Sequence, residues 1–179
     1  MQRRRRHAAR HSAGILTTIA PTRSEDNFVP GTPAELRAAF ERAAVARLAT
    51  IDADDRPNVV PICFAVCEST LYSAVDQKPK RSRKLKRLAN IAARPSVSVL
   101  VDHYSDDWTQ LWWMAAEGQA AIVDDAAKAA LAIDLLCAKY AQYRAAPPKG
   151  AVVAVRIDRW HGWSAALGTT TRIEERAER

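Results

Sequence analysis

A ten-residue basic segment between two predicted strands is the feature that most restricts the fold of this chain. Residues 78–87 contain seven Lys or Arg side chains and no acid. A strand-like run at 71–75 precedes them, and an alternating strand at 97–102 follows. A helical stripe that begins at Leu85 and continues through Leu88 and Ile91 links the segment to the second strand. This order places fixed positive charge at one end of a β-sheet, where it favours a phosphorylated or polyanionic ligand.

Two other interpretations of the basic segment are open. It could be a solvated helix face, although seven cations without an interleaved acid repel one another unless an anion binds. It could also contact a nucleic acid, but the cations are not interleaved with the aromatic residues on which single strands stack. The nucleic-acid interpretation is therefore the weaker of the two functional ones.

Composition favours a single water-soluble domain of the cytoplasm. The chain has 179 residues, 48% of them hydrophobic, and no apolar run approaches the length of a membrane span. The net charge of +7 arises from the basic segment and an Arg-rich start, and the rest of the body is mildly acidic. The three cysteines lack metal-ligand spacing and indicate a reducing compartment. No metal site is expected.

The charge pattern divides the chain into three parts. Residues 1–27 are expected to be a disordered Arg-rich tail, residues 28–167 the folded domain, and residues 168–179 a charged tail. An organelle transit peptide or a start codon placed too far upstream would also explain the first part. Whether residues 1–27 belong to the mature protein stays open.

Six strands and three helices are predicted in the body. A capping box at Thr32–Glu35 begins a helix that runs to about Ala44. The strand containing Pro61 is expected at an edge or a bulge, and the spacing of the first three strands predicts an antiparallel meander. Asp124 is expected to cap a helix with apolar residues at Ala127, Leu131, Leu135 and Tyr140. The strands are predicted at 45–51, 58–66, 71–75, 97–102, 111–123 with a bulge near Glu117 and Gly118, and 151–163.

These elements predict a mainly β (α+β) fold. Consecutive strands joined by hairpins favour a closed or nearly closed antiparallel barrel with helices packed outside, and an open α+β sheet is the alternative. The chain contains neither a G-x-G-x-x-G fingerprint nor a P-loop, which argues against a Rossmann or nucleoside-triphosphatase fold.

The ordered motifs resemble the pyridoxamine 5'-phosphate oxidase-like superfamily, whose fold is the FMN-binding split β-barrel. The resemblance covers about residues 28–165 and is closest to the actinobacterial branch that uses the deazaflavin coenzyme F420. It implies a six-stranded antiparallel split barrel with flanking helices. The motifs that carry the resemblance are 47–50, 56–61, 71–73, the basic helix, and 94–102.

The resemblance also implies roles for particular residues. Lys86 and Arg87 would hold the cofactor phosphate, and Trp113 would cover the ring system from a second subunit. The strand of Asn58, Val60, Pro61 and Ile62 would run along the ring, and Tyr72, Ser73 and Ala74 would lie beside the ribityl chain. Trp160-His161-Gly162 matches the terminal Trp-x-Gly of the family.

Two departures from the vitamin-B6 oxidases refine the expected function. Residues 164–168 stand where those enzymes carry an Arg-Leu-His-like substrate motif, so pyridoxamine phosphate is not the expected substrate. The loop at 76–82 is longer and more cationic than an FMN phosphate needs. Coenzyme F420 carries a phosphodiester and an oligoglutamate tail, whose carboxylates would be met along a groove by Lys78, Lys80, Arg81 and Arg83.

The expected function is hydride transfer between coenzyme F420 and an unknown small organic acceptor. The resemblance implies a homodimer with the cofactor at the subunit interface. An FMN-dependent oxidase or reductase and a non-catalytic flavin or F420 carrier are the alternatives, and a nucleic-acid-binding protein is a weaker one. No catalytic acid or base stands out, and His161 is expected to make a structural hydrogen bond.

Overall fold

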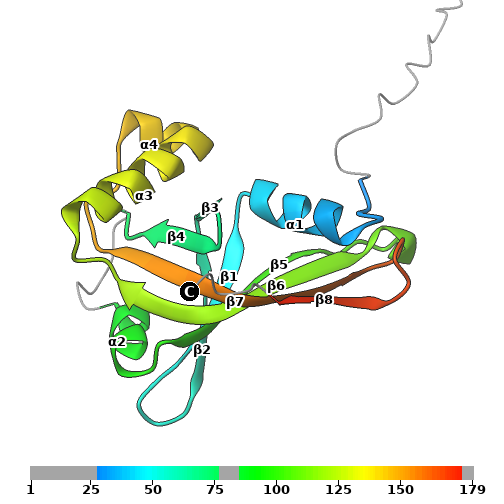
Figure 1. The fold of residues 1–179 in the computed structure, drawn as a ribbon, viewed down its shortest axis with the longest axis horizontal. Coiled ribbons are helices and arrows are strands. Elements are labelled where there is room, and N and C mark those ends of the chain that lie inside the picture. Colours follow the sequence, from blue (N-terminus) through cyan, green and yellow to red (C-terminus); the bar gives the residue numbers. More distant parts are fainter. Residues whose placement is uncertain (1–27, 77–84, 175–179) are drawn as a thin grey trace, which may run out of the picture.

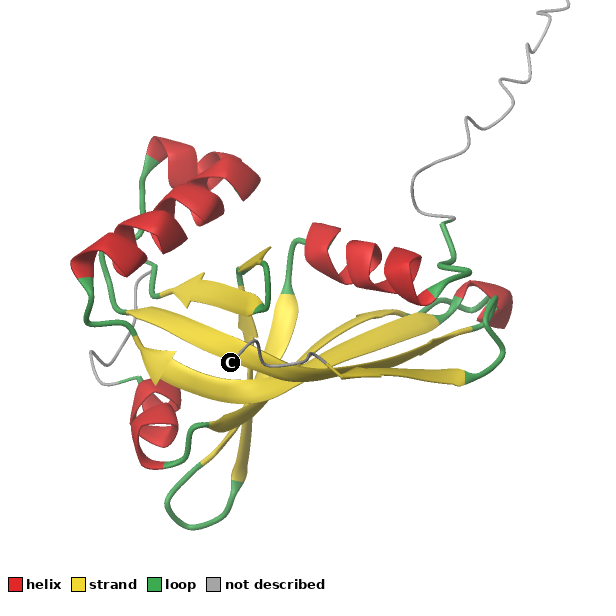
Figure 2. Cartoon of the chain, viewed as in Figure 1, coloured by secondary structure: helices red, strands yellow, loops and turns green. Residues whose placement is uncertain are grey.

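The computed structural model describes residues 28–76 and 85–174 (Figure 1). It is dominated by strands, with helices packed around them (Figure 2). The helices are α1 (Pro33–Arg42), α2 (Lys86–Ala93), α3 (Ala126–Lys139), α4 (Ala141–Ala145) and the short 3₁₀ helix η2 (Trp108–Gln110). The strands are β1 (Ala46–Ile51), β2 (Pro57–Ile62), β3 (Ala65–Cys67), β4 (Thr70–Ala74), β5 (Ser96–His103), β6 (Trp112–Ile122), β7 (Val152–Ser164) and β8 (Thr170–Glu174).

The strands form one antiparallel sheet in the order β2-β1-β5-β6-β7-β4-β3, and β8 pairs with β7. β2 and β3 lie at opposite ends of this order although only Cys63 and Phe64 separate them in the chain. Three residue steps span at most about 11 Å, so the two edges of the sheet must approach each other closely there. The sheet is therefore curled into a half-barrel, which confirms the predicted mainly β (α+β) split-barrel class.

The predicted meander of the first three strands is wrong within its middle strand. The β1–β2 and β3–β4 hairpins form as expected, but β2 and β3 are separate strands at opposite ends of the sheet order, and β4 also pairs with β7. The single strand predicted over 58–66 is divided by Phe64, which is fully buried. Its backbone N–H donates to the Tyr140 hydroxyl at 2.9 Å, and that hydroxyl donates back to its carbonyl oxygen at 2.9 Å. The side chain of Tyr140, at the end of α3, thus makes the hydrogen bonds to the Phe64 backbone that a neighbouring strand would otherwise make.

The main core lies inside the curl and takes residues from α1 and α2. In α1, Thr32 caps the helix by accepting a hydrogen bond from the Glu35 N–H at 3.2 Å, as predicted. Leu36 and Phe40 are fully buried, and the Phe40 ring packs edge-on against Trp160 with 4.9 Å between ring centroids. α2 contributes Ile91 to the same core. The two helices lie well apart along the sheet (Figure 1).

A second apolar cluster lies beneath α3 and α4. The predicted N-cap of α3 and its predicted apolar face are each wrong by one position. The N-cap of α3 is Asp125, not Asp124, and Ala132 and Leu136 are buried while Leu131 is 47% exposed. The predicted single helix is also divided at Tyr140, which caps α4. Alanine-rich helices carry little contrast between their faces, so their apolar stripe is poorly marked.

β6 is one continuous strand with the predicted bulge, at Glu117 and Gly118. The sheet also continues beyond residue 167, because β8 pairs with the second half of β7 from Arg159 to Trp163. This strand and the division of the predicted 58–66 strand into β2 and β3 raise the number of strands in the described residues from the six expected to eight. β4 pairs with residues 152–156 of β7, and β8 pairs with the next part of that strand, residues 159–163.

Candidate functional site

α2 brings the two described cations of the basic segment to one end of the half-barrel. Lys86 and Arg87 occupy its first turn, and the N-cap residue Leu85 makes no side-chain hydrogen bond to the N-terminal N–H groups of the helix. Free N–H groups and the helix dipole make this end electropositive, so two cations there are favourable only where anions lie nearby. The local chemistry is that of an anion-binding helix N-terminus.

Lys86 points toward the turn between β1 and β2. Its Nζ lies 2.8 Å from Asp52 Oδ2, and the Asp52 side chain is only 10% exposed. Asp52 Oδ1 accepts hydrogen bonds from the backbone N–H groups of Asp54 at 3.0 Å and Arg56 at 2.9 Å. The hydrogen bond from Lys86 and the one from the Arg56 backbone lower the pKa of Asp52 to about 2. An ammonium group has three donors, so two remain on Lys86 for another anion.

Arg87 follows Lys86 by about 100° around the helix axis and so points in a different direction. Burial lowers the pKa of its guanidinium, and the nearby Asp76 carboxylate opposes that effect. Asp76 follows the end of β4, and Tyr143 of α4 also acts on Arg87. The first turn of α2 therefore lies between the β1–β2 hairpin and the β4–α4 side of the molecule.

Asn58 is linked to α2 through Thr50. The buried Asn90 Nδ2 of α2 donates to Thr50 Oγ1 at 3.0 Å, and Thr50 is paired with Asn58 across β1 and β2. Within residues 28–76 and 85–174, Asn58 Oδ1 is buried and accepts no hydrogen bond. A buried acceptor without a donor is costly and indicates a place for a ligand N–H or a water.

The other predicted site residues have varied surroundings. Val60 and Ile62 pack on the main core, and Pro61 is exposed on the opposite face of β2. Tyr72 and Ala74 belong to the cluster beneath α3, where burial raises the pKa of Tyr72. Ser73 is buried on the other face of β4. The predicted sites at Lys78, Lys80, Arg81 and Arg83 lie outside the described residues.

Trp113 is not brought to the α2 end of the same chain. It points away from the core, opposite Trp112, and its ring contacts His161 edge-on with 5.5 Å between centroids. His161 Nε2 lies 3.7 Å from Glu117 Oε1, and Arg159 Nε donates to Glu117 Oε2 at 2.9 Å. These side chains belong to the outer face of the sheet, defined here by Arg47, Ala49, Ser98, Leu100, Trp113, Ala115, Glu117, Arg159, His161 and Trp163.

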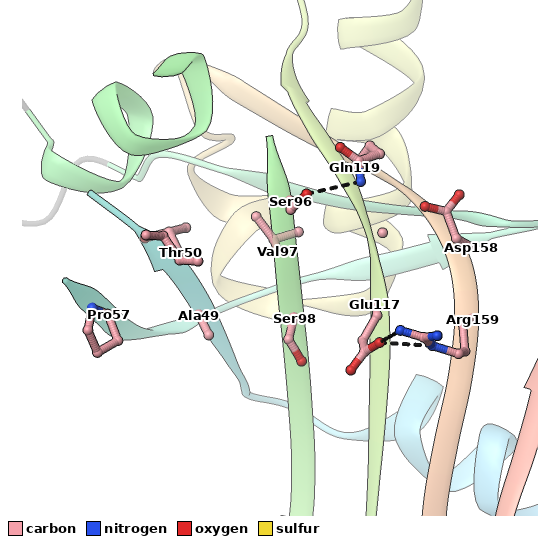
Figure 3. A pocket seen from close by; sticks show the side chains of 12 residues that line it. Ala49, Thr50, Pro57, Ser96, Val97, Ser98, Glu117, Gln119, Asp158 and Arg159 are labelled. Carbon is pink, nitrogen blue, oxygen red and sulfur yellow. Dashed lines mark hydrogen bonds and ion pairs between the residues drawn. The ribbon is translucent and has the colours of Figure 1, made fainter. Parts of the chain in front are cut away.

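A groove of about 620 Å³ crosses this outer face close to α2 (Figure 3). It runs from Pro57 and Ala49 across β5 and β6 to Arg159 of β7. Polar side chains along it include Ser96, which accepts a hydrogen bond from Gln119 Nε2 at 3.2 Å, and the ion pair of Glu117 with Arg159. The volume is in the range of small-ligand sites. The lining is mostly apolar surface of the strands, with a few polar side chains.

Sequence reasoning missed the polar residues of this groove. Ser96, Ser98 and Glu117 alternate with buried residues and therefore read as ordinary solvent-facing positions. In the sheet, Ser98 of β5 lies directly across from Glu117 of β6, and Glu117 lies directly across from Arg159 of β7. This cross-strand pairing brings the three polar side chains together. Polar and buried residues alternate along β5, β6 and β7. Once these strands are known to be neighbours, that alternation places the polar residues on one shared face.

The chain belongs to the pyridoxamine 5'-phosphate oxidase family, which it matches over residues 32–164. No curated protein sequence matches it. The family assignment agrees with the curled sheet and with the position of α2 between β4 and β5.

Solved structures with this fold are similar at low sequence identity. A conserved hypothetical protein from Mycobacterium tuberculosis is 19% identical with a TM-score of 0.62, over 84% of this chain and 96% of that chain. A FAD-binding protein from Mesorhizobium loti is 21% identical with a TM-score of 0.55, over 73% and 93% of the two chains. A heme binding protein from Mycobacterium smegmatis is 16% identical with a TM-score of 0.61, over 87% of this chain and 59% of that one.

Two kinds of feature are absent from the described residues. No group of three or more His, Cys, Asp or Glu side chains in them is arranged to hold a metal ion. None of the helices described is both long and apolar enough to cross a bilayer.

Proposed function

We propose that this protein is an oxidoreductase that transfers a hydride between coenzyme F420 and a small organic acceptor. Membership of the pyridoxamine 5'-phosphate oxidase family supports a flavin-type cofactor. The deazaflavin is preferred over FMN because the basic segment holds more cations than one phosphate needs. FMN dependence in the same fold is the first alternative.

The observation that carries the proposal is the first turn of α2. Lys86 and Arg87 accompany uncapped backbone N–H groups at the end of the half-barrel where β1, β2 and β4 meet the helix. A cofactor phosphate would accept hydrogen bonds from these N–H groups and from both cations.

The residues present fit such a cofactor. Two donors of Lys86 are left after its bond to Asp52, and the guanidinium of Arg87 is partly buried near Asp76. The buried Asn58 Oδ1 would accept an N–H donor, and a flavin or deazaflavin ring carries an imide N–H. When bound, the cofactor supplies the hydride chemistry. The protein binds the phosphate, orients the ring and excludes water.

The active form would be a homodimer with the cofactor at the subunit interface. The outer face of the sheet supports this proposal because it presents Trp113 and His161 away from the α2 site of their own chain. Apolar side chains next to it are exposed, Val59 to 60% and Ile51 to 40%. A contiguous exposed apolar patch of this kind supports an interaction site.

Cofactor titration tests the proposal. Cofactor-free protein would be titrated with coenzyme F420, FMN and haemin separately, with tryptophan fluorescence and the ligand spectrum as readouts. We expect tight binding of F420, weakened about tenfold or more in the Lys86→Gln, Arg87→Gln double variant because charge-assisted hydrogen bonds to phosphate are lost. The matched control is Lys149→Gln, Arg144→Gln, which removes the same charges from exposed positions near α4.

Each outcome has a distinct meaning. Preference for FMN would keep the site and replace the deazaflavin by the alternative cofactor. F420 binding without hydride transfer to any member of a quinone, enone and nitroarene panel would indicate a carrier. Haemin binding alone would favour a function like that of the similar heme binding protein. Binding of none of the three would contradict the proposal, and steeply salt-dependent binding to single-stranded DNA would then support the nucleic-acid alternative.

A further inference from the structure

Three polar contacts along one face of α2 hold it against β1 and its turn. Lys86 bonds to Asp52, Asn90 donates to Thr50 Oγ1, and Arg94 bonds to Asp55. The three helix positions are four residues apart and therefore lie on one side of the helix. Arg94 is the C-cap residue, so the contacts reach from the first turn of α2 to its end.

The contacts differ in burial. Asn90 and Thr50 are buried, and the Asp52 side chain is 10% exposed, whereas Asp55 is exposed. Buried polar contacts specify one arrangement because any displacement leaves a donor or acceptor unpaired. The helix is thus held in a single register relative to the β1–β2 hairpin.

Asp52 has a particular place among them. It bonds the ammonium of Lys86, the residue proposed to meet the cofactor phosphate, and its other oxygen is held by the Asp54 and Arg56 backbone N–H groups. A lysine side chain is flexible and loses rotamer entropy when it is immobilised. A buried carboxylate that already holds the ammonium removes much of that cost before the ligand arrives.

We propose that Asp52 is a positioning residue for the cofactor phosphate. Its carboxylate orients the Lys86 ammonium. The contacts of Asn90 with Thr50 and of Arg94 with Asp55 hold α2 in the position relative to the β1–β2 hairpin that this ion pair requires. This inference rests on the proposed function, since it assigns Asp52 a role at the same site. Asp52 does not touch the phosphate and acts through Lys86.

The test isolates the contribution of the phosphate. FMN and riboflavin differ only by that group, so the ratio of their dissociation constants measures the phosphate contact separately from the ring. The Asp52→Asn variant keeps an oxygen to accept from the Asp54 and Arg56 N–H groups and loses the charge that holds Lys86. We expect the ratio to fall about tenfold in this variant, with riboflavin affinity unchanged.

Matched variants separate positioning from a general effect of charge or stability. Asp54→Asn makes the same change in the same turn, where the carboxylate faces the exposed Arg56 at 3.5 Å, and should leave the ratio unchanged. In a Lys86→Gln background, Asp52→Asn should have no further effect, because the residue it acts through is gone. If Asp52→Asn does not fold, Asp55→Asn removes the exposed contact at the other end of α2 and should lower the ratio about twofold to threefold.

The results decide between the two proposals. A wild-type protein that binds neither FMN, riboflavin nor F420 contradicts the proposed function. Wild-type binding of FMN with an unchanged or increased ratio in Asp52→Asn overturns the positioning role and leaves the proposed function standing. A lowered ratio in both Asp52→Asn and Asp54→Asn also overturns it, since net charge alone would then explain the loss.

Discussion

Single residues in this protein replace contacts that a regular sheet would make for itself. Tyr140 is the clearest case, because its hydroxyl serves both backbone groups of Phe64 where β2 ends and β3 has not begun. Burial raises the pKa of this hydroxyl to about 12, so it keeps its proton and remains a donor. Lys139, its neighbour, donates to the Glu41 carbonyl at 2.6 Å and lies 3.8 Å above the Phe64 ring.

The buried amine of Lys139 predicts a rise of stability with pH. Burial lowers its pKa from 10.5 to about 8 in the folded protein, whereas the unfolded chain keeps the ordinary value. Above pH 8 the unfolded state therefore binds more protons than the folded state, and the free energy of unfolding increases with pH. We expect a gain of about 1 kcal/mol between pH 8 and about 9.5, reduced from the full shift because the ammonium is partly exposed.

Urea denaturation at a series of pH values measures this effect. The Lys139→Met variant should lose the rise, while Lys128→Met, at an exposed position of the same helix, should retain it. Equal slopes in all three proteins would show that another group is responsible. The range stops below pH 10 because buried tyrosines with raised pKa values act in the opposite direction above it.

Among the elements, β6 and β7 depend on a bulge that only glycine allows. A Cβ on Gly118 would lie 1.9 Å from the Arg156 carbonyl oxygen on the neighbouring strand. The bulge lets β6 change register between Glu117 and Gly118 and so directs Glu117 toward Arg159 and His161. The groove on the outer face therefore depends on this backbone irregularity.

The Gly118→Ala variant should destabilise the protein by about 2 kcal/mol or more, because two paired strands would have to separate. Chemical denaturation measures the change. Gly31→Ala is the control, since its Cβ would meet Glu35 at an ordinary contact distance of 3.5 Å. A Gly118→Ala variant as stable as the control would mean that the bulge relaxes without cost.

At the scale of the whole molecule, the half-barrel has two different surfaces. The concave side is filled by the main core and closed by α1 and α2, while the outer face of the sheet carries Trp113, His161 and Leu100, which no helix among residues 28–76 and 85–174 covers. Antiparallel sheets can expose one face to water, but an aromatic and aliphatic surface next to exposed Val59 favours a second subunit.

Leu100→Arg is therefore expected to disrupt the proposed dimer. An unpaired charge in the middle of an isologous interface is introduced twice and should raise the dimer dissociation constant about a hundredfold or more. Sedimentation velocity over a range of concentrations would measure it. Leu131→Arg is the control, because Leu131 is 47% exposed on α3 away from this face. A wild-type protein that is monomeric at all concentrations would contradict the homodimer.

The sequence by itself determined the class of fold, the capped helix α1, the bulge in β6 and the opposite orientations of Trp112 and Trp113. These features follow from short-range rules of periodicity, capping and glycine placement. Only the tertiary structure decided that β2 and β3 lie at opposite edges of the sheet, that Lys86 bonds to Asp52, and that Asn58 lies across from Thr50, the partner of Asn90. Strand order is set by the burial of whole faces and by contacts such as Phe64 with Tyr140, 76 positions apart in the chain. Local patterns carry no information on such contacts, because their energy depends on what the rest of the chain has already buried.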